Sequence, residues 1–236
     1  MVHPISRRVF LALTGGALAA PSISWSAAEV PTLLDHILLG CSDLDRGISF
    51  VEERTGVRAA FGGVHPGRGT QNALLSLGKL RYLEIIAPDP KQSGAEQFSA
   101  IIKLDPPRLI GWAAHRGNLG IFAGELGEEG VIFEGPAPGS RKRPDGRVLQ
   151  WQTLSLKDDA AGMLPFFIEW SNDSLHPSAD APKGCLLLHF EAASPDPDEL
   201  SRQVASLRLD LPVVKGERPQ LRAIISGPKG QFSITS

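Results

Sequence analysis

The chain has 236 residues, of which 42% are hydrophobic and 21% are charged, and this composition is typical of a soluble globular protein. Its 24 basic and 26 acidic residues give a formal net charge of −2, and no stripe of lysine and arginine alternates with aromatic side chains. The composition therefore argues against a nucleic-acid partner. The length allows one sizeable domain or several small units.

The first 28 residues have the features of an export signal rather than those of a folded domain. Arg7 and Arg8 form a twin-arginine start, a mildly apolar stretch covers 12–20, and Ser26-Ala27-Ala28 supplies the small residues of a cleavage site. The stretch is too short to span a bilayer, so we expect no stable membrane insertion after cleavage. The sequence predicts that the twin-arginine export machinery carries the chain to a periplasmic or other extracytoplasmic location.

The folded part begins with a predicted β-α-β-β-β unit over 33–90. An apolar strand covers 33–40, Asp43 caps a helix, and Gly56 ends it. A short strand and a loop rich in glycine follow, and Gly78-Lys79 joins the last two strands as a hairpin.

The same order of elements recurs twice, in a second unit over 109–172 and a fainter third unit over 185–236. In the second unit we expect a helix over 118–129, a short strand over 131–133 and a long loop over 135–146. The sequence therefore predicts an α+β protein built from three copies of a βαβββ module.

Two strands of the first unit each place one metal-competent side chain among apolar residues: His36 in the first strand and Glu84 in the last. Imidazole and carboxylate groups suit Zn, Fe, Mn, Ni or Co. Glu169 occupies in the second unit the place that Glu84 holds in the first, so the three residues would make a set of two carboxylates and one imidazole. Glu169 is alternatively a base that removes a proton next to an oxygen of the substrate.

Several other polar residues are candidates for contact with a substrate. Arg68 and Thr70, in the loop before a strand, can hold a carboxylate or phosphate, and His65 in the same loop is a candidate acid, base or further ligand. Arg147 leads from a basic loop into a strand and can make a two-pronged contact with an anion. His176 lies in the loop after the second unit and can cover the cleft.

Each of these residues also has a structural explanation. His36 would then be a buried histidine bonded to Asp35 or to a backbone carbonyl, and Glu84 would pair with Arg81 or Arg147. The loop residues would belong to ordinary turns and solvated loops.

Two further alternatives concern the third unit. Cys41 and Cys185 are either two buried thiols or, in an oxidising compartment, a disulfide. His189 lies in the third unit roughly where His36 lies in the first, so a cleft between these two units would bring the two histidines together.

Parts of the first unit together resemble a glyoxalase-like domain of the vicinal oxygen chelate superfamily. The segments that carry the resemblance are 34–37, 43–56, 69–74 and 82–86, and it extends over 109–172. It implies that paired modules form curved half-barrel sheets, that a cleft between modules holds a divalent metal, and that two chains can form a homodimer. The chemistry of such proteins ranges over isomerisation, epimerisation, ring cleavage and thiol addition.

On this resemblance, His36, Glu84 and Glu169 match metal positions, whereas Ile110 or Gly111 falls where the second unit would carry a histidine. We therefore expect an exported protein that binds a small, oxygen-rich, anionic metabolite in a cleft between modules. Two functions stay open: metal-dependent lyase, isomerase or dioxygenase chemistry, or metal-free binding and sequestering of the kind found in bleomycin-resistance proteins.

Overall fold

The computed structural model describes residues 30–92, 101, 103–143 and 145–236 of the chain. The predicted export signal lies outside the described residues. Among the helices that the structure describes, none is both long and apolar enough to span a membrane.

The first module forms in the predicted order of elements. It consists of β1 (Leu34–Gly40), α1 (Leu44–Thr55), β2 (Ala60–His65), β3 (Thr70–Ser76) and β4 (Tyr82–Pro88). The side chain of Asp43 accepts a hydrogen bond from the Arg46 backbone at the start of α1, and Gly56 ends the helix with a left-handed φ of 80°. Both predicted helix signals are confirmed.

The second module repeats this order but has a longer second strand than expected. Its elements are β5 (Arg108–His115), α3 (Leu119–Glu128), β6 (Phe133–Lys142), β7 (Val148–Leu156) and β8 (Phe166–Trp170). The prediction of a loop over 135–146 is wrong, because most of this segment pairs with β7. Pro136 and Pro138 lack a backbone donor, and an edge strand such as β6 tolerates this loss.

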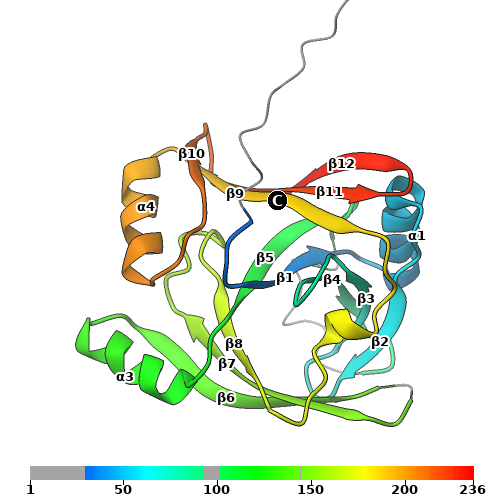
Figure 1. The fold of residues 1–236 in the computed structure, drawn as a ribbon, viewed down its shortest axis with the longest axis horizontal. Coiled ribbons are helices and arrows are strands. Elements are labelled where there is room, and N and C mark those ends of the chain that lie inside the picture. The colour runs from blue at the N-terminus through cyan, green and yellow to red at the C-terminus, as the bar shows by residue number, and fades with distance from the viewer. Residues whose placement is uncertain (1–29, 93–100, 102, 144) are drawn as a thin grey trace, which may run out of the picture.

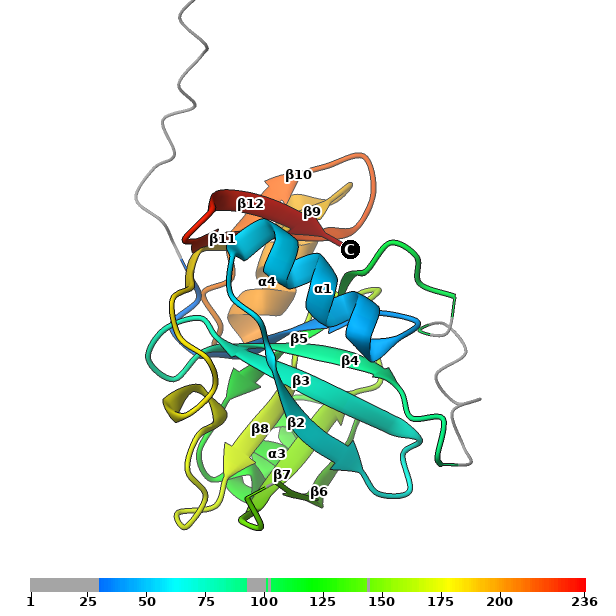
Figure 2. The same cartoon turned by 90° about the vertical axis from the view of Figure 1, so that its right-hand side faces the viewer.

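The two modules share one eight-stranded sheet with the order β2-β3-β4-β1-β5-β8-β7-β6. Within each module the first strand pairs parallel with the last, and β1 and β5 join the modules as antiparallel neighbours. The sheet curls into a half-barrel, and its two edge strands, β2 and β6, lie close to each other (Figures 1 and 2).

The third unit has the expected order of elements but a different topology. It consists of β9 (Leu186–Ser194), α4 (Pro197–Ser206), β10 (Val213–Lys215), β11 (Gln220–Gly227) and β12 (Gly230–Thr235). These strands form a separate sheet in the order β10-β9-β11-β12, so β12 lies at the edge instead of beside β9. The prediction of three equivalent modules is therefore wrong, and the protein has two.

The helix α1 lies between the two sheets, where it contacts β3 and β4 on one side and β11 and β12 on the other (Figure 2). Strand alternation sorts the residues of the large sheet into two faces. Ile37 and Leu83 are fully buried in the core with α1, whereas His36 and Glu84, one residue away on each strand, face the inside of the half-barrel.

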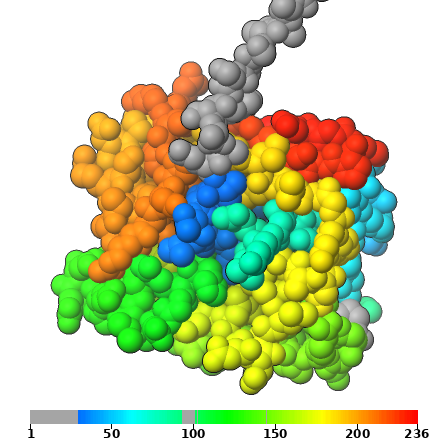
Figure 3. All heavy atoms as spheres, in the orientation of Figure 1, coloured from blue at the N-terminus to red at the C-terminus, as the bar shows by residue number. Residues whose placement is uncertain are grey.

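The connection from β8 to β9 is held against the β3–β4 hairpin. It contains the short 3-10 helix η2 (Pro177–Ala179). The backbone of Ser76 donates a hydrogen bond to Pro182, and that of Leu187 donates to Leu77. Figure 3 shows this connection crossing the face of the molecule in yellow. The tethered connection brings His176 close to β1.

Cys41 and Cys185 are both buried and free, which confirms the alternative of two separate thiols. Burial, together with the negative charge of Asp43, raises the pKa of the Cys41 thiol to about 12. Cys41 therefore acts as a small apolar side chain beneath α1.

The close approach of β2 and β6 depends on glycine at position 63. Its φ of +140° disfavours other residues, and an added Cβ would lie 3.0 Å from both the Lys142 carbonyl oxygen and Arg141 Cδ. Gly67 also has a positive φ, of +73°, but an added Cβ there would meet nothing within 4 Å.

We expect Gly63→Ala to destabilise the protein by about 2–4 kcal/mol, since it adds overpacking to backbone strain. Gly67→Ala, the matched control, carries only backbone strain and should cost about 1–2 kcal/mol. Urea unfolding of both variants measures the difference. Equal losses would show that β2 and β6 do not approach as closely as described.

Candidate functional site

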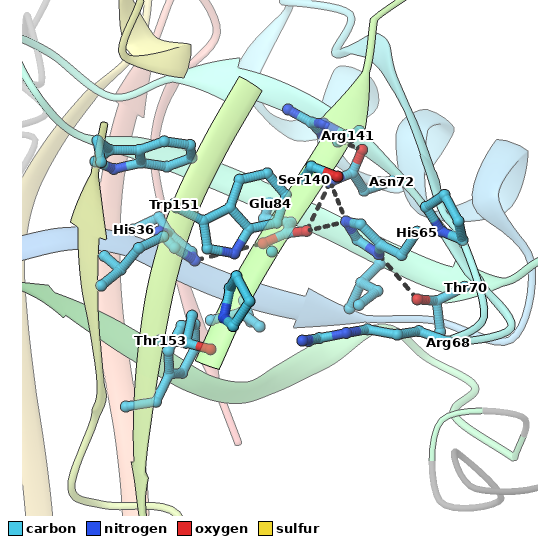
Figure 4. A pocket seen from close by; sticks show the side chains of 18 of the residues that line it. His36, His65, Arg68, Thr70, Asn72, Glu84, Ser140, Arg141, Trp151 and Thr153 are labelled. Carbon is cyan, nitrogen blue, oxygen red and sulfur yellow. Dashed lines mark hydrogen bonds and ion pairs between the residues drawn. The ribbon is translucent and has the colours of Figure 1, made fainter. Parts of the chain in front are cut away.

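The half-barrel encloses a cavity of about 380 Å³ between the two modules (Figure 4). Its polar lining comes mainly from the first module, and its aromatic lining mainly from the second. The polar residues are His36, His65, Arg68, Thr70, Asn72 and Glu84 from the first module, and Ser140, Arg141 and Thr153 from the second. The aromatic residues are Tyr82, Trp151, Phe166 and Trp170.

Glu84 is the acidic group of this cavity, and its side chain is engaged on both oxygens. Asn72 Nδ2 donates a hydrogen bond of 2.6 Å to Oε1, and His65 Nε2 lies 3.6 Å from the same oxygen. His36 Nε2 lies 3.4 Å from Oε2. Burial alone would raise the pKa of Glu84, but the two histidines, the Asn72 hydrogen bond and the charge of Arg141 outweigh it and hold this pKa below its ordinary value. Glu84 is therefore a buried anion.

Arg141 determines the orientation of the Asn72 amide. Its Nη1 donates a 2.5 Å hydrogen bond to Asn72 Oδ1, so the amide nitrogen must face Glu84 and His65. The distance from Asn72 Nδ2 to His65 Nε2 is 3.2 Å. Because this histidine nitrogen accepts, the proton lies on Nδ1, which donates to Thr70 Oγ1 at 2.9 Å.

His65 is consequently a neutral imidazole in the wall of the cavity. Burial lowers the pKa of His65, and although the charge of Glu84 opposes this shift, the charges of Arg141 and Arg68 add to it. The ring is thus held in one tautomer by Asn72 on one side and Thr70 on the other.

Two cations line the same cavity as this single carboxylate. Arg141 is only 3% exposed, and its Nε has no hydrogen-bond partner among the described residues. Arg68 also lines the cavity. The site therefore holds more positive than negative charge and offers guanidinium donors to an anionic ligand.

The structural explanation of His36 is correct in one respect. Its Nδ1 lies 2.8 Å from Asp35 Oδ1, and its ring stacks on Tyr82 with the centroids 4.5 Å apart. The other ring nitrogen nevertheless faces the carboxylate of Glu84 in the cavity. His36 is thus both a packed residue and a residue of the site.

The structural explanation of Glu84 is wrong. Arg81 donates to the Pro31 carbonyl, while Arg147 pairs with Asp145 and Asp180 at the surface. Neither arginine supplies the partner of Glu84.

Glu169 is not part of the cavity, so its expected roles as metal ligand and base are wrong. Its carboxylate accepts hydrogen bonds of 2.8 and 3.0 Å from the backbone nitrogens of Asn118 and Leu119 at the start of α3. Ile168 and Trp170 line the cavity on either side of it in sequence. The period of two along a strand therefore turns Glu169 to the opposite face, where it stabilises the helix terminus.

The other expected site residues divide into two groups. His65, Arg68 and Thr70 line the cavity as predicted. Arg147 is exposed in its surface ion pairs, and His176 contacts Asp35 behind the cavity lining. These two positions therefore do not bring a side chain to the ligand in the way that the sequence suggests.

The expected approach of His189 to His36 does not occur. His189 lies on β9 of the small sheet, where its Nε2 is 2.8 Å from Glu191 Oε2. The cavity pairs the first module with the second rather than with the third unit.

Asn72 and Arg141 are the two residues that the sequence analysis missed. A signal for Asn72 exists, because it is a polar residue inside the buried strand β3. Arg141 belongs to a segment that reads as a solvated basic loop, and only its pairing in β6 turns it inward.

The donor atoms do not fit the expected resident Zn, Fe, Mn, Ni or Co. Within the described ranges, no group of three or more His, Cys, Asp or Glu side chains is arranged to hold a metal ion. The amide hydrogens of Asn72 point at Glu84 Oε1 and His65 Nε2, where a cation would need free lone pairs. Only His36 Nε2 and Glu84 Oε2 are left, fewer than the three protein ligands of a typical catalytic zinc site.

A family model described as a glyoxalase-like domain matches residues 34–208. The chain belongs to the glyoxalase-like domain family. This places it in the vicinal oxygen chelate superfamily, as the sequence resemblance indicates. Among curated proteins no match is found.

Two solved structures of low sequence identity are similar to this chain to different degrees. A hypothetical protein from Staphylococcus aureus is 18% identical, with 85% of this chain and 84% of that chain covered and a TM-score of 0.62. Methylmalonyl-CoA epimerase from Mycobacterium tuberculosis is 19% identical, with 62% and 92% covered and a TM-score of 0.42. At 18% identity, the likeness to the Staphylococcus aureus protein concerns the fold alone.

The lowered pKa of Glu84 predicts how this glyoxalase-like protein responds to acid. A carboxylate whose folded pKa is depressed contributes stability above its unfolded pKa, and this contribution is lost as the pH falls through the folded pKa. We expect Glu84→Gln to be less stable than the wild type by about 1–3 kcal/mol at pH 7. The difference should shrink as the pH falls below about 4.5.

Urea unfolding between pH 7 and pH 3 measures this difference. Glu134→Gln is the matched control, because Glu134 is an exposed partner of Lys157 and its loss should cost less than about 1 kcal/mol. If the difference in unfolding free energy between Glu84→Gln and the wild type stays constant over this pH range, the depressed pKa of Glu84 is contradicted.

Proposed function

We propose that this protein binds a small, oxygen-rich, anionic metabolite in the half-barrel cavity and exchanges a proton with it at Glu84. The observation that carries the proposal is the buried anion Glu84, held by Asn72 and Arg141 in a cavity with a second cation, Arg68. Glu84 is deprotonated at neutral pH and shielded from water, so it is available to accept a proton, although its lowered pKa makes it a weak general base.

The cations and the base have separate tasks in this proposal. The guanidinium groups of Arg141 and Arg68, which both line the cavity, bind a carboxylate or phosphate of the ligand. Glu84 then removes a proton from the carbon next to a carbonyl or carboxylate, so the C–H bond breaks and an O–H bond forms. The electron pair moves into the neighbouring carbonyl, and the positive charge of the guanidinium groups favours the resulting oxyanion.

Of the expected reaction classes, isomerase and lyase chemistry fit this arrangement. Return of the proton to another position or face gives an isomerase, and loss of a leaving group from the adjacent carbon gives a lyase. Both reactions require only that Glu84 takes up a proton and that the arginines neutralise the negative charge that forms on the substrate.

A second candidate function is binding without conversion. The wall that β7 and β8 contribute is formed by Trp151, Thr153, Phe166, Ile168 and Trp170, none of which is an acid or base at neutral pH. Such a wall holds an apolar part of a ligand, as in a sequestering protein.

Proton exchange separates the two functions. We expect the wild type to catalyse loss of the C3 proton signal of short 2-oxo acids, such as pyruvate or 2-oxobutyrate, in D2O. Glu84→Gln should lower this rate by about 10²–10⁴-fold, because it removes the base. Binding of the same acids should change by only a few-fold, since both arginines are retained.

Proton NMR in D2O measures the exchange, and calorimetry measures the binding. Glu134→Gln, outside the cavity, serves as the control and should exchange like the wild type. Binding by the wild type without any exchange would support the sequestering function instead.

We also propose that the chain is exported through the twin-arginine machinery, on the basis of Arg7, Arg8 and the small residues at 26–28. Replacing both arginines by lysine should leave a longer precursor in the cytoplasm. Cell fractionation with immunoblotting measures this, and Arg218→Lys at an exposed position is the control. Unchanged delivery to the periplasm would contradict the proposal. The expected homodimer likewise stays a prediction.

A further inference from the structure

Behind the cavity lies a second buried carboxylate, Asp35, which is 1% exposed. Four ring nitrogens surround it. His36 Nδ1 lies 2.8 Å from Oδ1, while Trp170 Nε1 and His176 Nε2 lie 3.0 and 3.2 Å from Oδ2. His115 Nδ1, at the half-exposed end of β5, lies 3.6 Å from Oδ2.

The direction of these hydrogen bonds can be assigned from their other partners. The indole nitrogen of Trp170 can only donate. The backbone nitrogen of Ser178 donates to His176 Nδ1, so the proton of this ring lies on Nε2 and points at Asp35. Asp35 is therefore an acceptor for both neighbours.

Asp35 is consequently an anion. Burial would raise the pKa of Asp35, but the hydrogen bonds from His115, His176 and His36 outweigh this and hold the pKa well below its usual range. A carboxylate without a proton accepts only, so the His36 nitrogen that faces it must carry a hydrogen.

This constraint determines what His36 presents to the cavity. With its hydrogen on Nδ1, the ring turns Nε2 toward Glu84 Oε2, 3.4 Å away. Stacking on Tyr82 and an edge contact with Phe166 hold the ring in this orientation. The lone pair of Nε2 in the neutral ring therefore faces the Glu84 carboxylate and can accept a proton that Glu84 has taken up.

We propose that Asp35 is the positioning residue of the site. It keeps the hydrogen of His36 on Nδ1 and so leaves the lone pair of Nε2 facing Glu84, where this nitrogen takes over the proton that Glu84 removes from the ligand and later returns it. The use of this proton rests on the proposed function, whereas the tautomer of His36 does not.

The same carboxylate joins three parts of the chain. Through His36 it contacts the cavity, through Trp170 it contacts β8, and through His176 it contacts the connection that contains η2. Asp35 thus couples the orientation of the His36 ring to the joint between the two modules, and this explains why a charge is buried at a position that no ligand reaches.

Nitrogen NMR of the histidine rings tests the inference directly in the full-length wild type. In ¹⁵N-labelled protein, His36 should show a protonated Nδ1 in every state of the ring, and the neutral ring should lack a hydrogen on Nε2. A neutral His36 ring with its hydrogen on Nε2 would overturn the inference without any variant.

Asp35→Asn supplies the second test, because an amide cannot accept from all of these donors. We expect the neutral His36 ring to shift toward the Nε2–H tautomer. Exchange of the C3 proton of the 2-oxo acid should fall by about 10–100-fold, whereas binding of the acid should change by less than about threefold. An unchanged His36 spectrum in a folded Asp35→Asn variant would show that Asp35 is merely structural.

His115→Gln is the matched control. It removes a nitrogen from the same carboxylate but leaves Oδ1 and His36 in place, so the His36 spectrum should not change. The spectrum and the exchange rate also separate the two proposals. If the wild type shows the expected His36 tautomer but exchanges no proton, the positioning role of Asp35 is supported and only the proposed function is contradicted.

Discussion

The hydrogen bonds from Arg141 to Asn72 and from Asn72 to Glu84 are the interaction on which the rest of the site depends. They run from β6 at one edge of the sheet through β3 to β4, so they join the second module to the first. A buried carboxylate is stable only when donors and nearby cations compensate for its lost hydration. The same contacts therefore close the half-barrel and keep Glu84 charged, which means that the shape and the chemistry of the cavity are coupled.

The two modules have the same order of elements but contribute unequally to the cavity. Glu84 on β4 faces inward, whereas Glu169 on β8 faces outward and stabilises the N-terminus of α3. The inward positions of β8 carry Phe166, Ile168 and Trp170 instead. The result is a cavity with one charged wall and one aromatic wall, which suits an anionic head and an apolar body in a single ligand.

A residue's place is predictable where it follows from the residue's own strand or loop. His36, Glu84, Arg68 and Thr70 all reach the cavity as predicted. Glu169 does not, because one step along a strand reverses the face of the sheet. The strand β6, and with it Arg141, was not predicted, because its prolines are typical of loops. The third unit misled because the order of its elements says nothing about which of its strands pair.

By itself, the sequence determined the local elements, the two helix caps, and the membership of the chain in a glyoxalase-like family. These depend on neighbouring residues, whose periodicity and turn chemistry are visible in the chain. Only the tertiary structure decided that Arg141 reaches Asn72 and that four ring nitrogens, including that of His36, gather around Asp35. The physical reason is that these contacts join strands far apart in sequence, and their existence depends on how the curled sheet brings its edges together.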